Sequence, residues 1–315
     1  MSERRIGVLV MSYGTPESLD QVEAYYTHIR RGSPPSPEQL EELRSRYEAI
    51  VGGVFPLRQH TNEQVNALQA ELDARTAGTG ITYICYQGLK HAAPFIEDGI
   101  EAMARDGISE AVGIVLAPHY SIMSVGSYLK RAQEEADKHG ITFAGVKSYH
   151  LHLQLIEALV ERVNEQLDAY EQEGQKREQV QVLFSAHSLP EKILEMNDPY
   201  PEQLLETSRA IAKASELTDE QWQFTWQSAG QTGMPWLGPD ILDTLEQSAG
   251  EGRPAVISAP IGFVSDHLEV LYDLDIEAKQ KSNELGIGFK RTRSLNQDIR
   301  YIQTLADKVV EASQR

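Results

Sequence analysis

Cysteine is nearly absent from this chain, because Cys85 is the single cysteine among 315 residues. One cysteine excludes a framework of disulfides, and it also excludes an iron–sulfur cluster held by cysteine thiolates. The scarcity of cysteine fits a reducing compartment, where structural disulfides are rare. We therefore expect neither disulfides nor an iron–sulfur cofactor.

Positive charge is also scarce, since 29 lysines and arginines stand against 47 aspartates and glutamates, a net charge of −18. Such a charge argues against nucleic acid or an anionic membrane as the main partner. Long apolar runs are missing as well, and none approaches the ~20 residues that cross a bilayer. The N-terminal segment MSERRIGVLVMSYG has no signal-peptide h-region and no cleavage site. We expect a cytoplasmic protein without a membrane span.

Common nucleotide-binding and hydrolase motifs are missing too. No GxGxxG or GxxxxGK[ST] follows a predicted strand, so nucleotide binding has no support from motifs. No GxSxG motif is present either. Ser185 and Ser188 flank His187, but neighbours in sequence do not form a catalytic triad.

The chain does contain a regular alternation of short apolar runs and helical patterns. Strands are predicted at 6–11, 81–86, 111–116 and 141–146 in the first half, and at 179–184, 223–226, 255–258 and 287–290 in the second. Helices between consecutive strands indicate parallel sheets. The predicted fold class is α/β, with two similar Rossmann-like domains, each a four-stranded parallel sheet flanked by helices.

The two halves resemble each other where their strands end. The first strand of each half is followed by polar residues and a proline, SYGTP at 12–16 and SAHSLP at 185–190. The third strand of each half ends in Ala-Pro. We predict domains at 1–150 and 151–315, and leave open which domain the last helix, about 297–312, packs on.

Two segments carry the pattern of a helix-starting capping box. Ser36-Pro37-Glu38-Gln39 pairs a capping serine with glutamine three residues later and places proline at the first helical position. Thr61-Asn62-Glu63-Gln64 repeats the pattern and predicts the start of a third helix.

Carboxylates recur at helical spacing in the segment DHLEVLYDLDIE, residues 266–277. Asp266, Glu269, Asp273 and Glu277 step by three, four and four, so a regular helix would place them on one face. Like charges four residues apart destabilise a helix by roughly 0.2–0.5 kcal/mol per pair. A solvated acidic face is one interpretation. We favour a bound cation, because the segment follows a predicted strand and contains His267.

His187 follows the first strand of the second half, and open parallel sheets bind ligands beyond the carboxyl ends of their strands. A histidine there can simply satisfy backbone groups. We expect Ser188 to cap a following helix and to hold the imidazole at that edge. Imidazole together with carboxylate suits a divalent metal such as iron(II) or zinc.

Four segments resemble motifs of the ferrochelatase family. They are YTHIRRG (26–32), SAHSLP (185–190), WQSAGQTGMPWLGPD (226–240) and GFVSDHLEVLYD (262–273). The motifs occur in family order and cover nearly the whole chain. The chain is most similar to the short ferrochelatases of Gram-positive bacteria, which insert iron(II) into coproporphyrin III.

This resemblance implies a chelatase fold with a porphyrin cleft between two domains. It assigns the metal-handling histidine to His187, the partner glutamate to Glu269 and the tyrosine that binds product iron to Tyr13. Porphyrin contacts map to Arg30, Arg46, Tyr47 and Tyr128. A second, outer metal site, a candidate for Mg²⁺, maps to Asp273 and Glu277.

The chain departs from the family pattern at Phe55, where relatives usually carry a small polar residue before Pro-Leu. A hydroxyl contact to a propionate is therefore lost. Phe55 either stacks on the macrocycle or packs below its loop.

The basic residues between 27 and 59 form an island in an acidic chain. Arg30, Arg31 and Arg46 are expected to bind propionates through charge-assisted hydrogen bonds. The expected partners are coproporphyrin III, Fe²⁺ and a downstream haem-pathway enzyme, with a monomeric chain and no cofactor beyond the substrate iron. The alternatives are a protoporphyrin IX ferrochelatase, a sirohydrochlorin-type cobalt chelatase, a non-catalytic porphyrin or haem carrier, and a two-lobed solute-binding protein.

Overall fold

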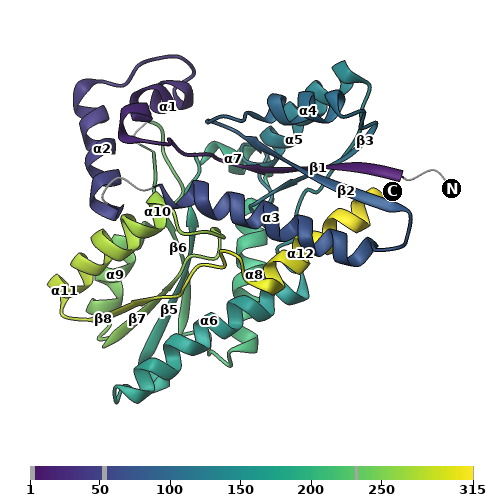
Figure 1. The fold of residues 1–315 in the computed structure, drawn as a ribbon. Coiled ribbons are helices and arrows are strands. Elements are labelled where there is room, and N and C mark those ends of the chain that lie inside the picture. The colour runs from purple at the N-terminus through teal and green to yellow at the C-terminus, as the bar shows by residue number, and fades with distance from the viewer. Residues whose placement is uncertain (1–3, 52–54, 231–232, 315) are drawn as a thin grey trace. The chain divides into compact units, whose positions relative to one another are not determined.

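The computed structural model describes residues 4–51, 55–230 and 233–314, so Gln231 and Thr232 of the motif WQSAGQTGMPWLGPD (226–240) lie outside the described residues. The chain divides into two compact units, one formed by Met1–Tyr149 with Asn296–Arg315, the other by His150–Leu295 (Figure 1). The chain thus leaves the first unit after Tyr149 and returns to it at Asn296.

A four-stranded parallel sheet forms the centre of the first unit. Its strands are β1 (Arg4–Ser12), β2 (Ile81–Leu89), β3 (Glu110–Val115) and β4 (Thr142–Gly145). They lie in the order β2-β1-β3-β4. The middle of β1 is fully buried, as expected for a strand covered on both faces.

Helices cover both faces of this sheet. They are α3 (Pro56–Thr76), α4 (Ile96–Arg105), α5 (Val125–His139) and α12 (Ile299–Ser313). Figure 1 shows α4 and α5 on one side of the strands and α3 and α12 on the other, and α12 packs on α3 and β3. The last helix, whose partner the sequence left open, therefore belongs to the first unit.

Two further helices, α1 (Val22–Ile29) and α2 (Pro37–Val51), lie between β1 and α3. The first predicted capping box is confirmed: the Gln39 amide donates to Ser36 Oγ, and Gln39 Oε1 accepts from the Ser36 amide. The second is wrong. α3 already begins at Pro56, with proline at its first position, so Thr61 is buried inside the helix.

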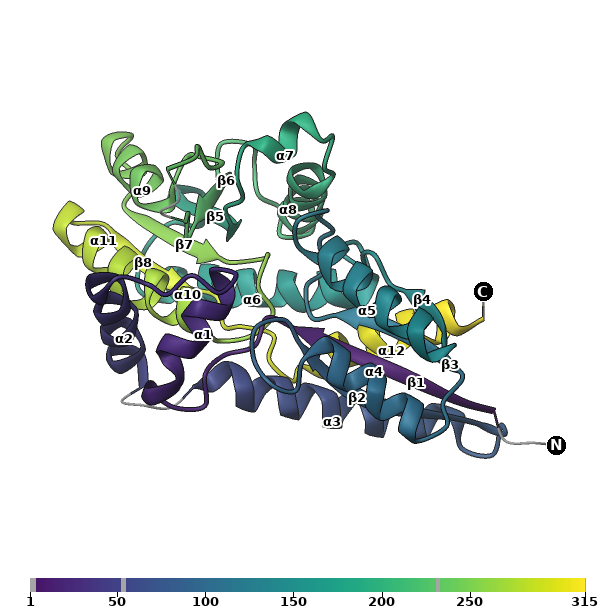
Figure 2. The same cartoon turned by 90° about the horizontal axis from the view of Figure 1, so that it is seen from above.

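The second unit repeats the arrangement, so the predicted fold class is confirmed. Its strands are β5 (Val180–His187), β6 (Trp222–Gln227), β7 (Ala255–Ala259) and β8 (Gly288–Arg291), in the order β6-β5-β7-β8. Its longer helices are α6 (Leu153–Gln172), α8 (Tyr200–Ala214), α9 (Ile241–Gly250) and α11 (Lys279–Leu285). α6 and α8 pack together on one face, while α9 and α11 pack together on the other (Figure 2).

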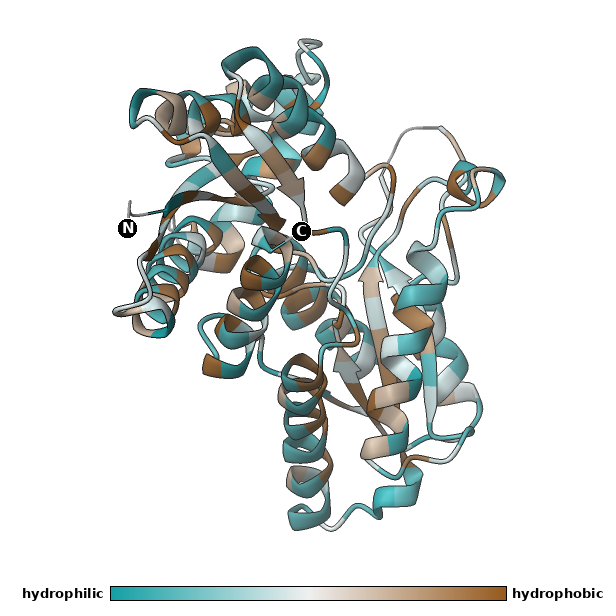
Figure 3. Ribbon diagram, turned by 90° about the vertical axis from the view of Figure 1, so that its right-hand side faces the viewer, coloured by the Kyte–Doolittle hydropathy of each residue, from teal (hydrophilic) through white to brown (hydrophobic). Residues whose placement is uncertain are grey.

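Hydropathy follows this layering. Figure 3 shows long brown stretches along the central strands, whereas the helices alternate brown and teal. α4 buries Ile96, Ile100 and Met103 against β1 and β2, a spacing of four and three that matches one helical face. Among the described residues, no helix is both long and apolar enough to cross a membrane.

Candidate active site

His187 is the last residue of β5, at the carboxyl edge of the second sheet. Its Nδ1 lies 2.5 Å from the carbonyl oxygen of Ser188. Because a carbonyl can only accept, Nδ1 carries a proton, and Nε2 is the ring nitrogen left to face other groups. The ring centroids of Trp236 and Phe263 lie 6.2 and 6.4 Å away. His187 therefore has Nε2 available as a ligand, with the aromatic rings of Trp236 and Phe263 beside it.

The expected helix cap at Ser188 is wrong. The helix that follows, α7, spans Lys192–Glu195, and Ser188 Oγ instead donates to the carbonyl of Leu237 at 2.7 Å. Pro190 forms a bridge with Trp236 before the helix can begin. The hydroxyl thus ties the end of β5 to the 235–239 segment rather than to a helix.

The acidic segment is not one regular helix, so the single stripe of four carboxylates is also wrong. Asp266 precedes helix α10 (Leu268–Leu271), because His267 is fully extended. Asp266 accepts from Ser294 Oγ at 2.7 Å and pairs with Arg291 at 3.3 Å. After α10 the chain enters a π-helix, Asp273–Ala278, in which the amide of Glu277 bonds the carbonyl of Tyr272.

His267, which the sequence reading did not assign to the site, pairs with Glu269. Its Nδ1 donates to the carbonyl of Ser265 at 2.8 Å, and its Nε2 lies 3.2 Å from Glu269 Oε2. Since Nδ1 already carries a proton, a close contact between Nε2 and a carboxylate oxygen requires a second proton between them. Phe263 contacts both His187 and His267, which places the two imidazoles around one ring.

Asp273, the first residue of the π-helix, is buried, with 6% of its surface exposed. It accepts a hydrogen bond from Ser228 Oγ. Glu277 is half-buried on the π-helix. Among the described residues, no group of three or more histidine, cysteine, aspartate or glutamate side chains is arranged to hold a metal ion. A metal at this segment would need ligands in addition to those already gathered.

In the first unit, Tyr13 follows β1 and is 40% exposed. Its ring is tilted against His91 at 4.6 Å between centroids, and His91 Nδ1 lies 3.0 Å from His28 Nδ1. Burial, with smaller effects of Lys90, His28 and Arg131, lowers the pKa of His91 to about 3, so its ring is neutral.

The three predicted propionate-binding arginines lie on α2 and at the end of α1. Arg30 and Arg31 are exposed, and Arg30 Nε donates to the carbonyl of Ser33 at 3.2 Å. Arg31 has a positive φ of 57°, uncommon outside glycine. Arg46 is half-buried. Arg30 and Arg31 therefore present their charge to solvent.

Three predicted porphyrin contacts are buried rings. Tyr47 and Phe55 are 5% and 6% exposed and pack on each other, 4.8 Å between centroids. Tyr128 is 4% exposed and lies under the ammonium of Lys90, 4.7 Å from its centroid. Burial, and to a smaller extent Arg131, lowers the pKa of Lys90 to about 8. Lys90 has no periodic sequence signal that would have singled it out.

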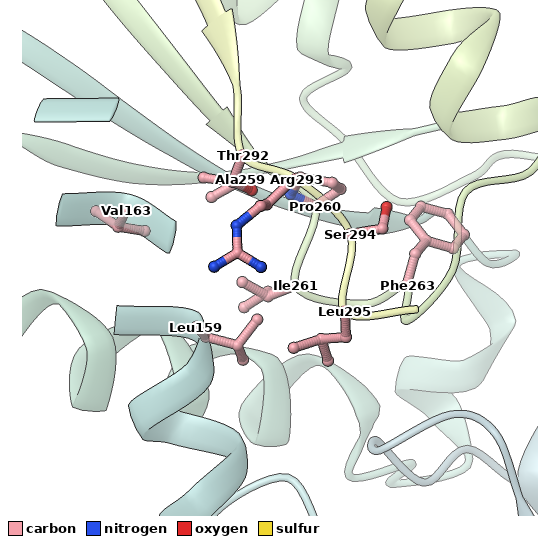
Figure 4. Close-up of a pocket in the computed structure, with 10 residues that line it drawn as sticks. All are labelled: Leu159, Val163, Ala259, Pro260, Ile261, Phe263, Thr292, Arg293, Ser294 and Leu295. Atoms are coloured by element: carbon pink, nitrogen blue, oxygen red, sulfur yellow. The ribbon is translucent and has the colours of Figure 1, made fainter. Parts of the chain in front are cut away.

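A small pocket of the second unit has Phe263 in its lining (Figure 4). It is lined by Leu159, Val163, Ala259, Pro260, Ile261, Phe263, Thr292, Arg293, Ser294 and Leu295. The lining contains neither His187 nor Glu269, and most of it is apolar. The pocket therefore adjoins the candidate site through Phe263 but contains none of its proposed metal ligands.

Comparisons with known proteins show the family of the chain. The family model described as ferrochelatase matches residues 5–313. A coproporphyrin III ferrochelatase of Bacillus subtilis is 45% identical over 313 residues, 99% of each chain. A ferrochelatase of Herpetosiphon aurantiacus is 45% identical over 304 residues, 96% of this chain and 97% of the relative.

The fold has counterparts among solved structures. The sirohydrochlorin chelatase SirB of Bacillus subtilis, solved with Fe³⁺, superposes with a TM-score of 0.58 at 11% identity, covering 98% of this chain and 96% of SirB. CbiX, described as the terminal enzyme of sirohaem biosynthesis in denitrifying bacteria, gives 0.52 at 13% identity, covering 97% and 99%. At such identities the likeness shows the fold alone.

Proposed function

Because the chain belongs to the ferrochelatase family, lyases of haem biosynthesis, we propose that it inserts ferrous iron into coproporphyrin III to give Fe-coproporphyrin. Support for this porphyrin comes from curated relatives. Those named for coproporphyrin III include one from Bacillus cereus, 46% identical over 98% of both chains. We propose a cytoplasmic monomer with no cofactor beyond the substrate iron.

Metallation exchanges one divalent cation for two pyrrole protons, so the protein must deliver a metal and remove protons. The observation that carries our assignment is the fixed tautomer of His187, whose Nδ1 is bound to a backbone carbonyl. Its Nε2 is then an imidazole nitrogen, a ligand of intermediate softness that binds iron(II). We propose that His187 binds the incoming iron.

Proton removal is assigned to the pair of His267 and Glu269. The contact of 3.2 Å between Nε2 and Oε2 holds one proton, which the pair must pass to water before it can take a proton from a pyrrole. The two pyrrole protons would then leave through the pair one after the other. Because the proton lies between the two groups, we assign it to the pair and not to either residue. Glu269 remains the predicted metal partner of His187.

The planar macrocycle hides its nitrogen lone pairs, so it must bend before a metal can enter. Binding of remote groups can supply strain of about 1–5 kcal/mol. We propose that Arg30, Arg31 and Arg46 provide this binding through propionates, since an arginine fork matches a carboxylate. Tyr13 is proposed as the exposed phenol that contacts product iron.

An anaerobic assay tests the proposal. The protein is mixed with iron(II) and coproporphyrin III, and the absorbance change of metallation is followed over many equivalents. Turnover is expected. Binding of a single equivalent of porphyrin without metallation would instead identify a carrier, and metallation of sirohydrochlorin alone would identify the other chelatase class.

A further inference from the structure

Gln227, the last residue of β6, connects the sheet to the acidic segment. It pairs in register with His187 and is 1% exposed. Its Nε2 donates to the backbone carbonyl of Glu269 at 3.0 Å, while its Oε1 accepts from Ser185 Oγ at 2.8 Å. A flipped amide would point its oxygen at that carbonyl, so the side chain has one orientation.

Ser228 makes a second connection to the same segment. Its backbone has a φ of 61°, a left-handed value that costs free energy in a serine and persists where the surroundings hold it. This conformation accompanies the hydrogen bond from Ser228 Oγ to the buried carboxylate of Asp273. The bond spans 45 residues of sequence, so it is a tertiary contact and not a local turn.

The segment between these two contacts has an irregular backbone. The amide of Tyr272 bonds the carbonyl of Leu268, four residues back, whereas the amide of Glu277 bonds that of Tyr272, five residues back. The backbone hydrogen bonds thus change from the i→i−4 pattern of an α-helix to the i→i−5 pattern of a π-helix at Tyr272. External contacts therefore decide where Glu269 lies.

Resting on the function proposed above, we propose that Gln227 and Ser228 are positioning residues for metal insertion. Gln227 fixes the backbone of Glu269, and Ser228 fixes Asp273 one turn later. Together they hold the Glu269 carboxylate beside His267 at the edge where β5 places His187. Neither side chain needs to touch metal or porphyrin, so their loss affects metal handling and not porphyrin affinity.

The test uses three variants and one matched control. Ser228→Gly keeps the left-handed backbone and removes only the hydroxyl. Gln227→Met keeps the length and removes both hydrogen bonds, and Ser185→Ala removes one of them. Ser282→Ala is the control, because Ser282 is buried like Gln227 and Ser185 and loses one local bond, 2.8 Å to the carbonyl of Ala278 four residues earlier.

Zinc, which is redox-inert, is titrated calorimetrically without porphyrin, and the binding that disappears in His187→Ala defines the site. We expect Ser228→Gly and Gln227→Met to weaken this zinc affinity about tenfold or more, as is typical when a contact supporting a ligand is removed. Ser185→Ala should have a smaller effect, and Ser282→Ala none. The KM for iron(II) should rise in the first two variants while porphyrin affinity, measured by fluorescence quenching, stays constant.

Equal zinc affinity in Ser228→Gly, Gln227→Met and Ser282→Ala would overturn the proposal, as would a parallel loss of porphyrin affinity. The two proposals fail separately. If the unmodified protein does not metallate porphyrin, the proposed function falls, while the zinc titration still decides whether the two side chains position the site.

Discussion

At the scale of the residue, a backbone carbonyl determines what each histidine of the site can do. His187 and His267 both donate through Nδ1 to a carbonyl, at Ser188 and Ser265. Both therefore present Nε2, the first beside aromatic rings and the second beside Glu269. Two imidazoles that donate through the same ring nitrogen can thus serve different roles because their neighbours differ.

Replacement of His187 by alanine should abolish metallation and leave porphyrin binding largely intact, since the imidazole is assigned to the metal and not to a propionate. Steady-state metallation and fluorescence quenching by porphyrin measure the two properties. His139→Ala, in α5 of the other unit, is the control. Turnover of the His187 variant near the unmodified rate would make this histidine structural.

Replacement of Phe55 by serine should mainly destabilise the fold. The ring is buried against Tyr47, and truncating a buried phenylalanine costs about 3–5 kcal/mol. Urea unfolding measures the loss, and Phe55→Leu should lose less. A change in porphyrin affinity without loss of stability would favour stacking on the macrocycle, the other role open from the sequence.

Lys90 predicts a pH dependence of stability. Its pKa is lowered from 10.5 to about 8, mainly by burial. Between these two values the unfolded chain binds more protons than the folded one, so this residue makes the free energy of unfolding rise with pH from about 8 to about 10.5. Lys90→Met should be more stable than the unmodified protein at pH 7 and should lack that rise. Urea unfolding of both proteins across this range checks it, and equal slopes would contradict it.

At the scale of the element, the segment 268–278 combines a short α-helix with a π-helix that carries Asp273 and Glu277. We predict that Asp273→Asn with Glu277→Gln removes an outer Mg²⁺ site while preserving the fold. The fold should persist because the asparagine can still accept the hydrogen bond from Ser228 Oγ.

Metal titration monitored by activity, with thermal unfolding in parallel, measures both effects. Glu284→Gln, an exposed change on α11, is the control. Identical Mg²⁺ responses in the double variant and the control would mean that the carboxylates form a solvated surface.

Periodicity predicted the strands and most helices because burial on both faces produces continuous apolar runs. It failed where tertiary contacts outweigh local pattern. The capping box predicted at Thr61 does not form, because Pro56 starts α3 five residues earlier. Asp266 lies outside the helix, where it binds Arg291 and Ser294, which are distant in sequence. The pairing of His267 with Glu269 depends on side-chain direction at a helix start, which spacing alone does not encode.

At the scale of the whole molecule, the acidic chain carries a basic island near α1 and α2, where Arg30 and Arg31 are exposed. Coproporphyrin III has four propionates and protoporphyrin IX has two. We therefore predict a higher kcat/KM for coproporphyrin III, with a ratio that shrinks as ionic strength rises and screens these charges. Steady-state rates with both porphyrins at low and high salt measure it, and equal kcat/KM at low salt would contradict the prediction.

The return of α12 to the first unit has a consequence for synthesis on the ribosome. All strands and helices of the second unit lie within His150–Leu295, so that unit is complete before α12 is translated. The strands of the first unit are translated earlier, but its core is incomplete until α12 supplies the buried side chains of Tyr301, Leu305 and Val309. A premature stop near residue 296 would therefore damage the N-terminal unit and spare the one translated after it.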